Sequence, residues 1–152
     1  MNPIALLRRL EDLGAGLLPH WLVSLALRVG LAVPFFRSGI TKWDGFLKLN
    51  DTDILLFTDE FKLHVFGKVY DYPYPAVMAY LSALGETILP VLLVIGLFTR
   101  LSGLGLLLMT ALIQLTIPTG WPIHITWAAM AAGVIALGPG RLSLDGAMGR
   151  SY

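Results

Sequence analysis

One stretch, residues 76–100, limits the fold more than any other part of the sequence. It reads AVMAYLSALGETILPVLLVIGLFTR, and before the closing arginine its only acidic or basic side chain is Glu86. As a helix rising about 1.5 Å per residue, this stretch covers the roughly 30 Å of a bilayer's hydrocarbon core. A carboxylate at mid-membrane depth is costly, so it faces a partner or a cavity. The stretch therefore predicts a spanning helix built around a buried carboxylate.

Composition places the whole chain among membrane proteins. Of the 152 residues, 56% are hydrophobic and only 14% are charged, whereas soluble domains have about a quarter charged. A net charge of +1 without a basic run argues against nucleic-acid binding. The chain has no cysteine, which excludes disulfides, thiolate metal sites and iron–sulfur clusters. Its three histidines, with at most one well inside the membrane, argue against bis-histidine haem ligation. No metal site is predicted.

Four apolar runs predict four membrane spans. Tryptophans at both ends of the first run, Trp21 and Trp43, are typical interface anchors. We therefore expect an all-α, four-helix transmembrane bundle that forms a single integral membrane domain over residues 1–152. The predicted spans are residues 20–43, 76–98, 101–117 and 122–137.

Two further helices are predicted to lie on the membrane rather than across it. Leucines at helical spacing near the N-terminus, from Leu6 to Leu17, favour an interfacial helix that Pro19 ends. In the polar segment 44–75, apolar residues from Ile54 to Val65 repeat at helical spacing. They predict a short amphipathic helix in the first outer loop.

An even number of spans puts both termini on one side of the membrane. Five arginines are associated with that side, against a smaller group of lysines in or beside segment 44–75. The positive-inside rule then predicts cytoplasmic termini. We expect a multi-pass protein of the bacterial inner membrane with segment 44–75 outside.

The depths of polar residues along the spans predict a site. Arg28 lies about 12 Å above the inner end of its helix, and Glu86 about 15 Å below the outer end of its own. We therefore predict a buried Arg28–Glu86 pair, with both residues as catalytic candidates. Further polar side chains trend toward an outer-half pocket and are candidates for cofactor binding: Lys42, Gln114, His124 and Arg37.

A structural interpretation of the same residues stands beside this one. The Arg28–Glu86 pair is equally well explained as fixing helix register. Gln114 is typical of hydrogen bonds between helices, and Lys42 of an interface anchor. His124 has Trp121 and Trp127 nearby, which slightly favours a structural role.

Three segments together resemble the DoxX family of small four-helix membrane proteins. They are LRVGLAVPFFRSGITKW, LGETILPVLLVIGLFTR and WAAMAAGVIALGPGRLSLD, and the resemblance runs from about Leu25 to Asp145. The segment from Asn50 to Tyr70 is longer than the family's minimal first loop. The resemblance implies a membrane subunit of a quinone-linked redox system.

The leading hypothesis is therefore an oxidoreductase-type subunit that binds a quinone headgroup between its helices. Arg28, Lys42, Gln114 and His124 would donate hydrogen bonds to the quinone oxygens, and Glu86 would relay protons. The alternative is a non-catalytic scaffold subunit that docks a partner enzyme or a secreted metal-handling peptide. A third and weaker hypothesis is that the protein is a small transporter, because four short spans show no evident inverted repeat. The expected partners are the lipid bilayer and other membrane or periplasmic subunits. Homo-oligomer formation stays open, as does whether the chain is itself an enzyme.

Overall fold

The computed structural model describes residues 4, 6, 14 and 16–149 of the chain. Most of the predicted N-terminal interfacial helix lies outside these residues, so that helix stays a prediction.

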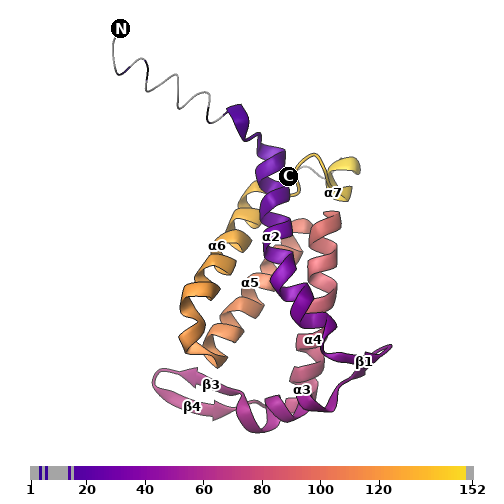
Figure 1. Cartoon of the computed structure of the whole chain (residues 1–152), viewed down its shortest axis with the longest axis vertical. Helices are drawn as coiled ribbons and strands as arrows, with labels where there is room; N and C mark the ends of the chain where they lie inside the picture. The colour runs from indigo at the N-terminus through magenta and orange to yellow at the C-terminus, as the bar shows by residue number, and fades with distance from the viewer. Residues whose placement is uncertain (1–3, 5, 7–13, 15, 150–152) are drawn as a thin grey trace.

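Four long helices form the body of the protein (Figure 1). Helix α2 packs against α4 and α6, and α5 also packs against α4 and α6, so the four close into a ring. Among the described residues, these four helices are long and apolar enough to cross a membrane, the fourth when it is counted from Pro118 to Leu137 with the 3-10 turn Pro118–Gly120 that leads into it. The predicted all-α four-helix bundle is confirmed. Its members are α2 (His20–Ile40), α4 (Pro75–Ile95), α5 (Thr99–Thr116) and α6 (Trp121–Leu137).

The connection between α4 and α5 is tight because two residues adopt left-handed backbone conformations. Gly96 ends α4 with φ of 73°, and Phe98 precedes α5 with φ of 50°. A left-handed glycine is a common helix stop, because it lacks the Cβ that would make this conformation costly. The second span therefore ends at Ile95, a few residues before the predicted boundary.

The two ends of the bundle differ in their covering. At one end, which we call the α7 end, α2 begins and residues 138–149 fold over the helices with the short α7 (Leu144–Ala147). The other end, the hairpin end, is covered by residues 41–74. Which end faces the cytoplasm stays a prediction.

Residues 41–74 contain two small hairpins and a short helix between them. The predicted amphipathic helix is confirmed only for residues 51–60; its extension to Val65 is wrong, because Val65 ends a strand. A turn at Phe66 and Gly67 brings Lys62 opposite Asp71, and the two form an ion pair of 2.7 Å. In chain order the elements are β1 (Trp43–Gly45), β2 (Lys48–Leu49), α3 (Asp51–Leu55), a π-helix (Leu56–Glu60), β3 (Lys62–Val65) and β4 (Lys68–Asp71).

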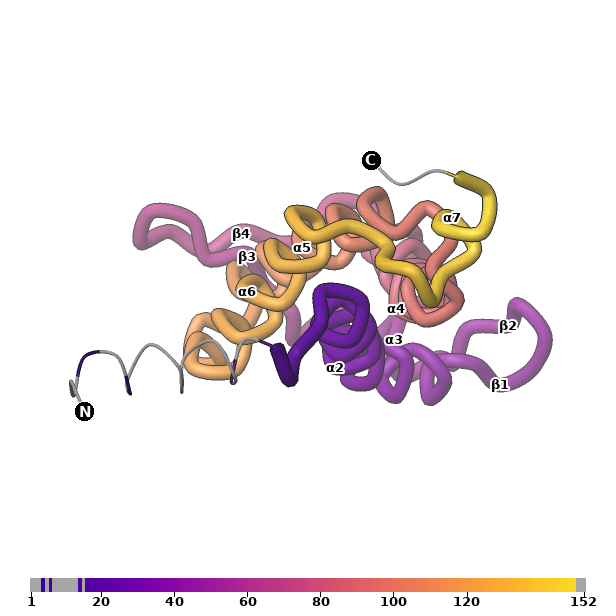
Figure 2. Tube along the Cα trace, turned by 90° about the horizontal axis from the view of Figure 1, so that it is seen from above, coloured from indigo at the N-terminus to yellow at the C-terminus, as the bar shows by residue number. Residues whose placement is uncertain are grey.

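Residues 50–74, which we call the cap, close the ring at the hairpin end. Phe57 and Tyr72 are buried in a small apolar cluster with Ala79 and Ala83 of α4. The Tyr72 hydroxyl lies 2.6 Å from Thr116 Oγ1 at the end of α5. The cap is thus attached to both α4 and α5. Seen from above, the two hairpins project from opposite sides of the bundle (Figure 2).

Candidate functional site: a cavity between the helices and the cap

A cavity of about 440 Å³ lies inside the hairpin-end half of the bundle, with lining residues from all four long helices and the cap. Most of its wall is apolar. Trp127 of α6 packs against Phe35 of α2 with ring centroids 5.1 Å apart, and Phe57 and Tyr72 of the cap form part of the lining. A cavity of this size, largely apolar with several aromatic rings in its wall, has the character of a small-molecule site.

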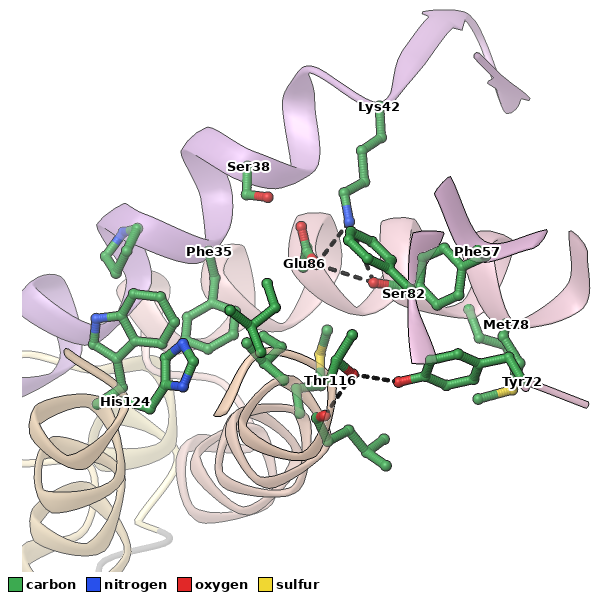
Figure 3. A pocket seen from close by; sticks show the side chains of 18 residues that line it. Phe35, Ser38, Lys42, Phe57, Tyr72, Met78, Ser82, Glu86, Thr116 and His124 are labelled. Carbon is green, nitrogen blue, oxygen red and sulfur yellow. Dashed lines mark hydrogen bonds and ion pairs between the residues drawn. The ribbon is translucent and has the colours of Figure 1, made fainter. Parts of the chain in front are cut away.

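A buried ion pair forms one polar end of the cavity (Figure 3). Lys42 Nζ lies 2.8 Å from Glu86 Oε1, and the side chains are only 12% and 6% exposed. Ser82, one turn before Glu86 on α4, donates a hydrogen bond of 3.0 Å to the same oxygen. The carboxylate predicted to sit at the centre of the fold therefore has a lysine as its partner.

A glycine allows α2 and α4 to meet at this level. A Cβ built on Gly39 would lie 2.7 Å from the carbonyl carbon and oxygen of Glu86. Since real Cβ contacts essentially never fall below 3.0 Å, any side chain at this position would force the helices apart. Close approach at Gly39 brings Lys42, just beyond the end of α2, within reach of Glu86.

The second carboxylate oxygen of Glu86 is unsatisfied. Oε2 is buried and has no hydrogen-bond partner in the described part of the chain, while Oε1 accepts from both Lys42 and Ser82. A buried polar atom without a partner costs about 1–3 kcal/mol. Glu86 lines the cavity, but Oε2 itself has essentially no exposed surface, so a ligand supplies the missing donor only once the carboxylate turns toward the cavity.

His124 also lines the cavity, and Figure 3 draws it on the other side of Phe35 from the ion pair. Its Nδ1 lies 2.7 Å from Gln114 Oε1, and Gln114 Nε2 donates to the Pro118 carbonyl at 3.0 Å. Gln114 itself does not line the cavity. The two predicted cofactor ligands thus satisfy each other, as the structural interpretation expected of Gln114.

The predicted Arg28–Glu86 pair is wrong. Arg28 is 1% exposed and donates to the carbonyls of Leu93, Val94, Pro139 and Leu142 at 2.6–2.9 Å. The helices are staggered: Gly39 of α2 is level with Glu86, whereas Arg28 is level with the last turn of α4. Eleven residues of α2 separate those two levels, which is about 16 Å. Depths counted from helix ends fail here, because α2 begins about two turns beyond the level where α4 ends.

Arg28 belongs instead to a cluster that ties the α7 end together. The last carbonyls of α4 lack partners within the helix, and the guanidinium supplies donors for two of them. Asp145 accepts from the backbone N–H of Phe98 and Thr99 at 3.2 and 2.8 Å, which caps the start of α5. Its own N–H donates to the Gly96 carbonyl at 2.9 Å. Sequence reasoning missed this role of Asp145, although the residue lies in the quoted DoxX-like segments.

Arg37 lies outside the cavity and is exposed on α2. Sequence reasoning overlooked Asp53, a buried residue of α3. Burial raises the pKa of Asp53, the nearby Lys42 lowers it, and the negative charges of Glu86 and Asp44 raise it further. Two carboxyl groups, Asp53 and Glu86, thus share the field of one lysine. Within the described residues, no three His, Asp or Glu side chains are grouped as a metal site requires.

The DoxX family profile matches residues 23–119, well over half of the chain. The chain belongs to the DoxX family. The matched region includes Lys42 and Glu86 and ends before His124 and Asp145. A Haemophilus influenzae protein named only as uncharacterized is 28% identical over 160 residues, covering 95% of this chain and 91% of the relative. No solved structure matches the chain.

Proposed function

We propose that this DoxX protein is the quinone-binding membrane subunit of a redox system, with the quinone headgroup in the cavity between the Lys42–Glu86 pair and the aromatic wall. The observation that carries the proposal is the unsatisfied Glu86 Oε2 inside a cavity of about 440 Å³. Ionisable groups inside a membrane bundle are costly and are generally kept for function.

The lining suits a flat ring with oxygens on its edge. Phe35, Trp127 and Phe57 provide apolar and aromatic contact area. Lys42 donates to Glu86 and Ser82, and an ammonium group has a further N–H for a ring oxygen. In this assignment Lys42 binds a headgroup oxygen and Glu86 exchanges protons with it. His124 forms part of the wall, Gln114 orients the imidazole, and Arg28 and Arg37 are left out of the site.

In this proposal a partner subunit supplies or accepts the electrons of the headgroup. We place the protein in the bacterial inner membrane with the α7 end cytoplasmic. The cysteine-free chain allows a direct test of this orientation. A single cysteine replacing the exposed Thr58 of the cap should react with an impermeant thiol reagent from outside; reaction only from the cytoplasm would reverse the orientation.

One observation favours the scaffold alternative: Gln114 and His124 form a hydrogen bond with each other, so this bond needs no ligand. Quinone content separates the two functions. The purified protein should carry stoichiometric quinone on lipid extraction, and Ser38→Trp, which places a large ring at the cavity edge, should reduce that content. Its matched control is the neighbouring Arg37→Gln, outside the cavity, which should leave the content unchanged. If the unmodified protein never carries or takes up quinone, the scaffold function is correct.

A further inference from the structure

At the ion-pair end of the cavity, Glu86 offers only acceptors, while the donors that remain among the described residues are one N–H of Lys42 and the hydroxyl of Ser38 at the cavity edge. Glu86 Oε1 already accepts from Lys42 and Ser82, and the buried Oε2 accepts from nothing in the described structure. A carboxylate has no donor of its own. At this end of the cavity, the unmet requirement is therefore a hydrogen-bond donor.

His124 does not change this balance. The Pro118 carbonyl can only accept, so the Gln114 amide must direct its NH₂ group to Pro118 and its oxygen to His124. His124 Nδ1 then carries the proton that Gln114 accepts. In this neutral tautomer Nε2 is an acceptor, so the imidazole has no second N–H for a ketone oxygen.

The two redox forms of a quinone differ in this respect. The ketone oxygens of the oxidised form only accept hydrogen bonds, whereas the hydroxyl groups of the quinol also donate them. The remaining N–H of Lys42 can serve either form. Only the quinol gives Glu86 Oε2 a partner. We propose, on the basis of the proposed function, that the cavity binds the quinol more tightly than the quinone, with the Glu86 carboxylate turning so that its buried Oε2 accepts a hydrogen bond from one ring hydroxyl.

The preference is measurable without any partner enzyme. The purified protein in lipid nanodiscs is titrated with a short-tailed benzoquinone at controlled potential, and the midpoint potential of the bound couple is compared with that of the free couple. We expect at least about tenfold tighter quinol binding, equivalent to about 1.4 kcal/mol. This raises the midpoint potential of the two-electron couple by about 30 mV.

Glu86→Gln tests the assignment at the atom itself. The amide oxygen can still face Lys42 and Ser82, which turns an NH₂ donor toward the cavity, so the quinol preference should vanish or invert. Arg37→Gln, outside the cavity, should keep it. Equal binding of both forms by the unmodified protein, or tighter quinone binding, overturns this inference and leaves the proposed function standing. Binding of neither form overturns both, and this measurement does not depend on whether Glu86→Gln folds.

A separate set of observations concerns the tips of the two hairpins. Phe46 and Phe66 are fully exposed, at 96% and 101%. Phe66 and Leu47 have φ of 49° and 53°, in the left-handed region. Hairpin turns usually place Asn, Asp or Gly at such positions, because bulkier residues are strained there. Each tip therefore combines an uncovered aromatic ring with one strained apolar residue, Leu47 beside Phe46 and Phe66 itself, and neither feature stabilises the fold.

The hairpins lie where a membrane surface would be. β1 begins at Trp43, shortly after α2 ends, and β4 ends at Asp71, shortly before α4 begins. They extend beyond the bundle on opposite sides (Figures 1 and 2). A lysine closely follows each tip, Lys48 and Lys68. Aromatic rings next to lysines suit the boundary between acyl chains and headgroups. We infer that both tips insert into the bilayer surface and hold the cap against it.

Nitroxide labels on single cysteines test this inference in nanodiscs. Labels at Phe46→Cys and at Phe66→Cys should be relaxed mainly by oxygen, which partitions into lipid. A label at Thr58→Cys on the exposed side of the cap should be relaxed mainly by a water-soluble nickel chelate. Tip labels relaxed mainly by the chelate would overturn the inference. So would tip labels shielded from both reagents, which is the result expected if a protein covers the tips.

Discussion

The two ends of the bundle treat their buried charges in opposite ways. At the α7 end, Arg28 donates to four carbonyl groups and Asp145 accepts from two backbone N–H groups. At the hairpin end, Lys42 and Glu86 pair beside a cavity, and one carboxylate oxygen has no partner. The first charges tie chain segments together, whereas the second pair leaves an acceptor without a partner among the described residues beside a cavity, and the proposed function rests on this difference. Membrane depth alone does not distinguish the two cases.

The largest effect is expected at the α7 end. Arg28→Met would remove the donor from the carbonyls of Val94, Pro139 and Leu142, while Leu93 keeps the Gly96 N–H; a buried carbonyl left without a donor costs about 1–3 kcal/mol. Arg28→Lys should rescue little, because a single ammonium lacks the spread of the planar guanidinium. Thermal unfolding in detergent measures both. Two stable variants that lose quinone would place Arg28 in the site and remove the contrast between the ends.

The next effect is expected from the buried pair at the hairpin end. Lys42→Met should cost about 3–5 kcal/mol, since it leaves Glu86 as a lone buried charge. The double variant Lys42→Met/Glu86→Gln should recover most of this loss while quinone retention stays low. The exposed pair Lys62–Asp71 is the matched control, and its removal should cost at most about 1 kcal/mol. Additive effects of the buried substitutions would show that Lys42 and Glu86 do not act as a pair.

A smaller effect is expected for the cap of α5. Asp145→Ala removes the acceptor for the N–H groups of Phe98 and Thr99, and loss of such a cap costs about 0.5–2 kcal/mol. The unfolding temperature should fall and quinone affinity should not. Weaker quinone binding in a variant of normal stability would show that the two ends are coupled.

The smallest effect is a pH dependence at Asp53. Its pKa is raised above the ordinary 3.8, mainly by burial, so the folded state binds this proton more tightly than the unfolded state. That contribution to stability is present at low pH and is lost as pH rises through the folded pKa. Asp53→Asn, which resembles the protonated form, should therefore flatten the decline in unfolding temperature between the ordinary value of 3.8 and the raised pKa of the folded state. Since Lys42, Glu86 and Asp44 act on Asp53, the comparison is repeated in Asp44→Asn. An unchanged profile in Asp53→Asn would contradict the assignment.

The four spans could be predicted from sequence because the length and apolarity of each run decide them locally. The partner of Glu86 could not, because the stagger between α2 and α4 depends on where Gly39 meets the backbone of α4. Depths counted from the helix ends predicted Arg28 as the partner of Glu86, whereas in the structure the partner is Lys42. The second hairpin was missed for another reason: helical spacing continues to Val65, and Phe66 is an unusual residue for a tight turn. Asp145 could not be linked to Thr99 from sequence, since 46 positions separate them.

The contact at Gly39 has a consequence for how the chain can vary. Adding one methyl group there would bring the new carbon within 2.7 Å of the Glu86 carbonyl, and the helices could only respond by separating. Lys42 is three positions further along the same segment, so separation would also lengthen the contact between its ammonium and the carboxylate. The small size of Gly39 thereby keeps the Lys42 and Glu86 side chains close enough to form their ion pair, although Gly39 is not part of it. Because this contact is with backbone atoms of α4, no change of side chain at position 42 or 86 relieves it, and any residue other than glycine at position 39 is expected to weaken the ion pair.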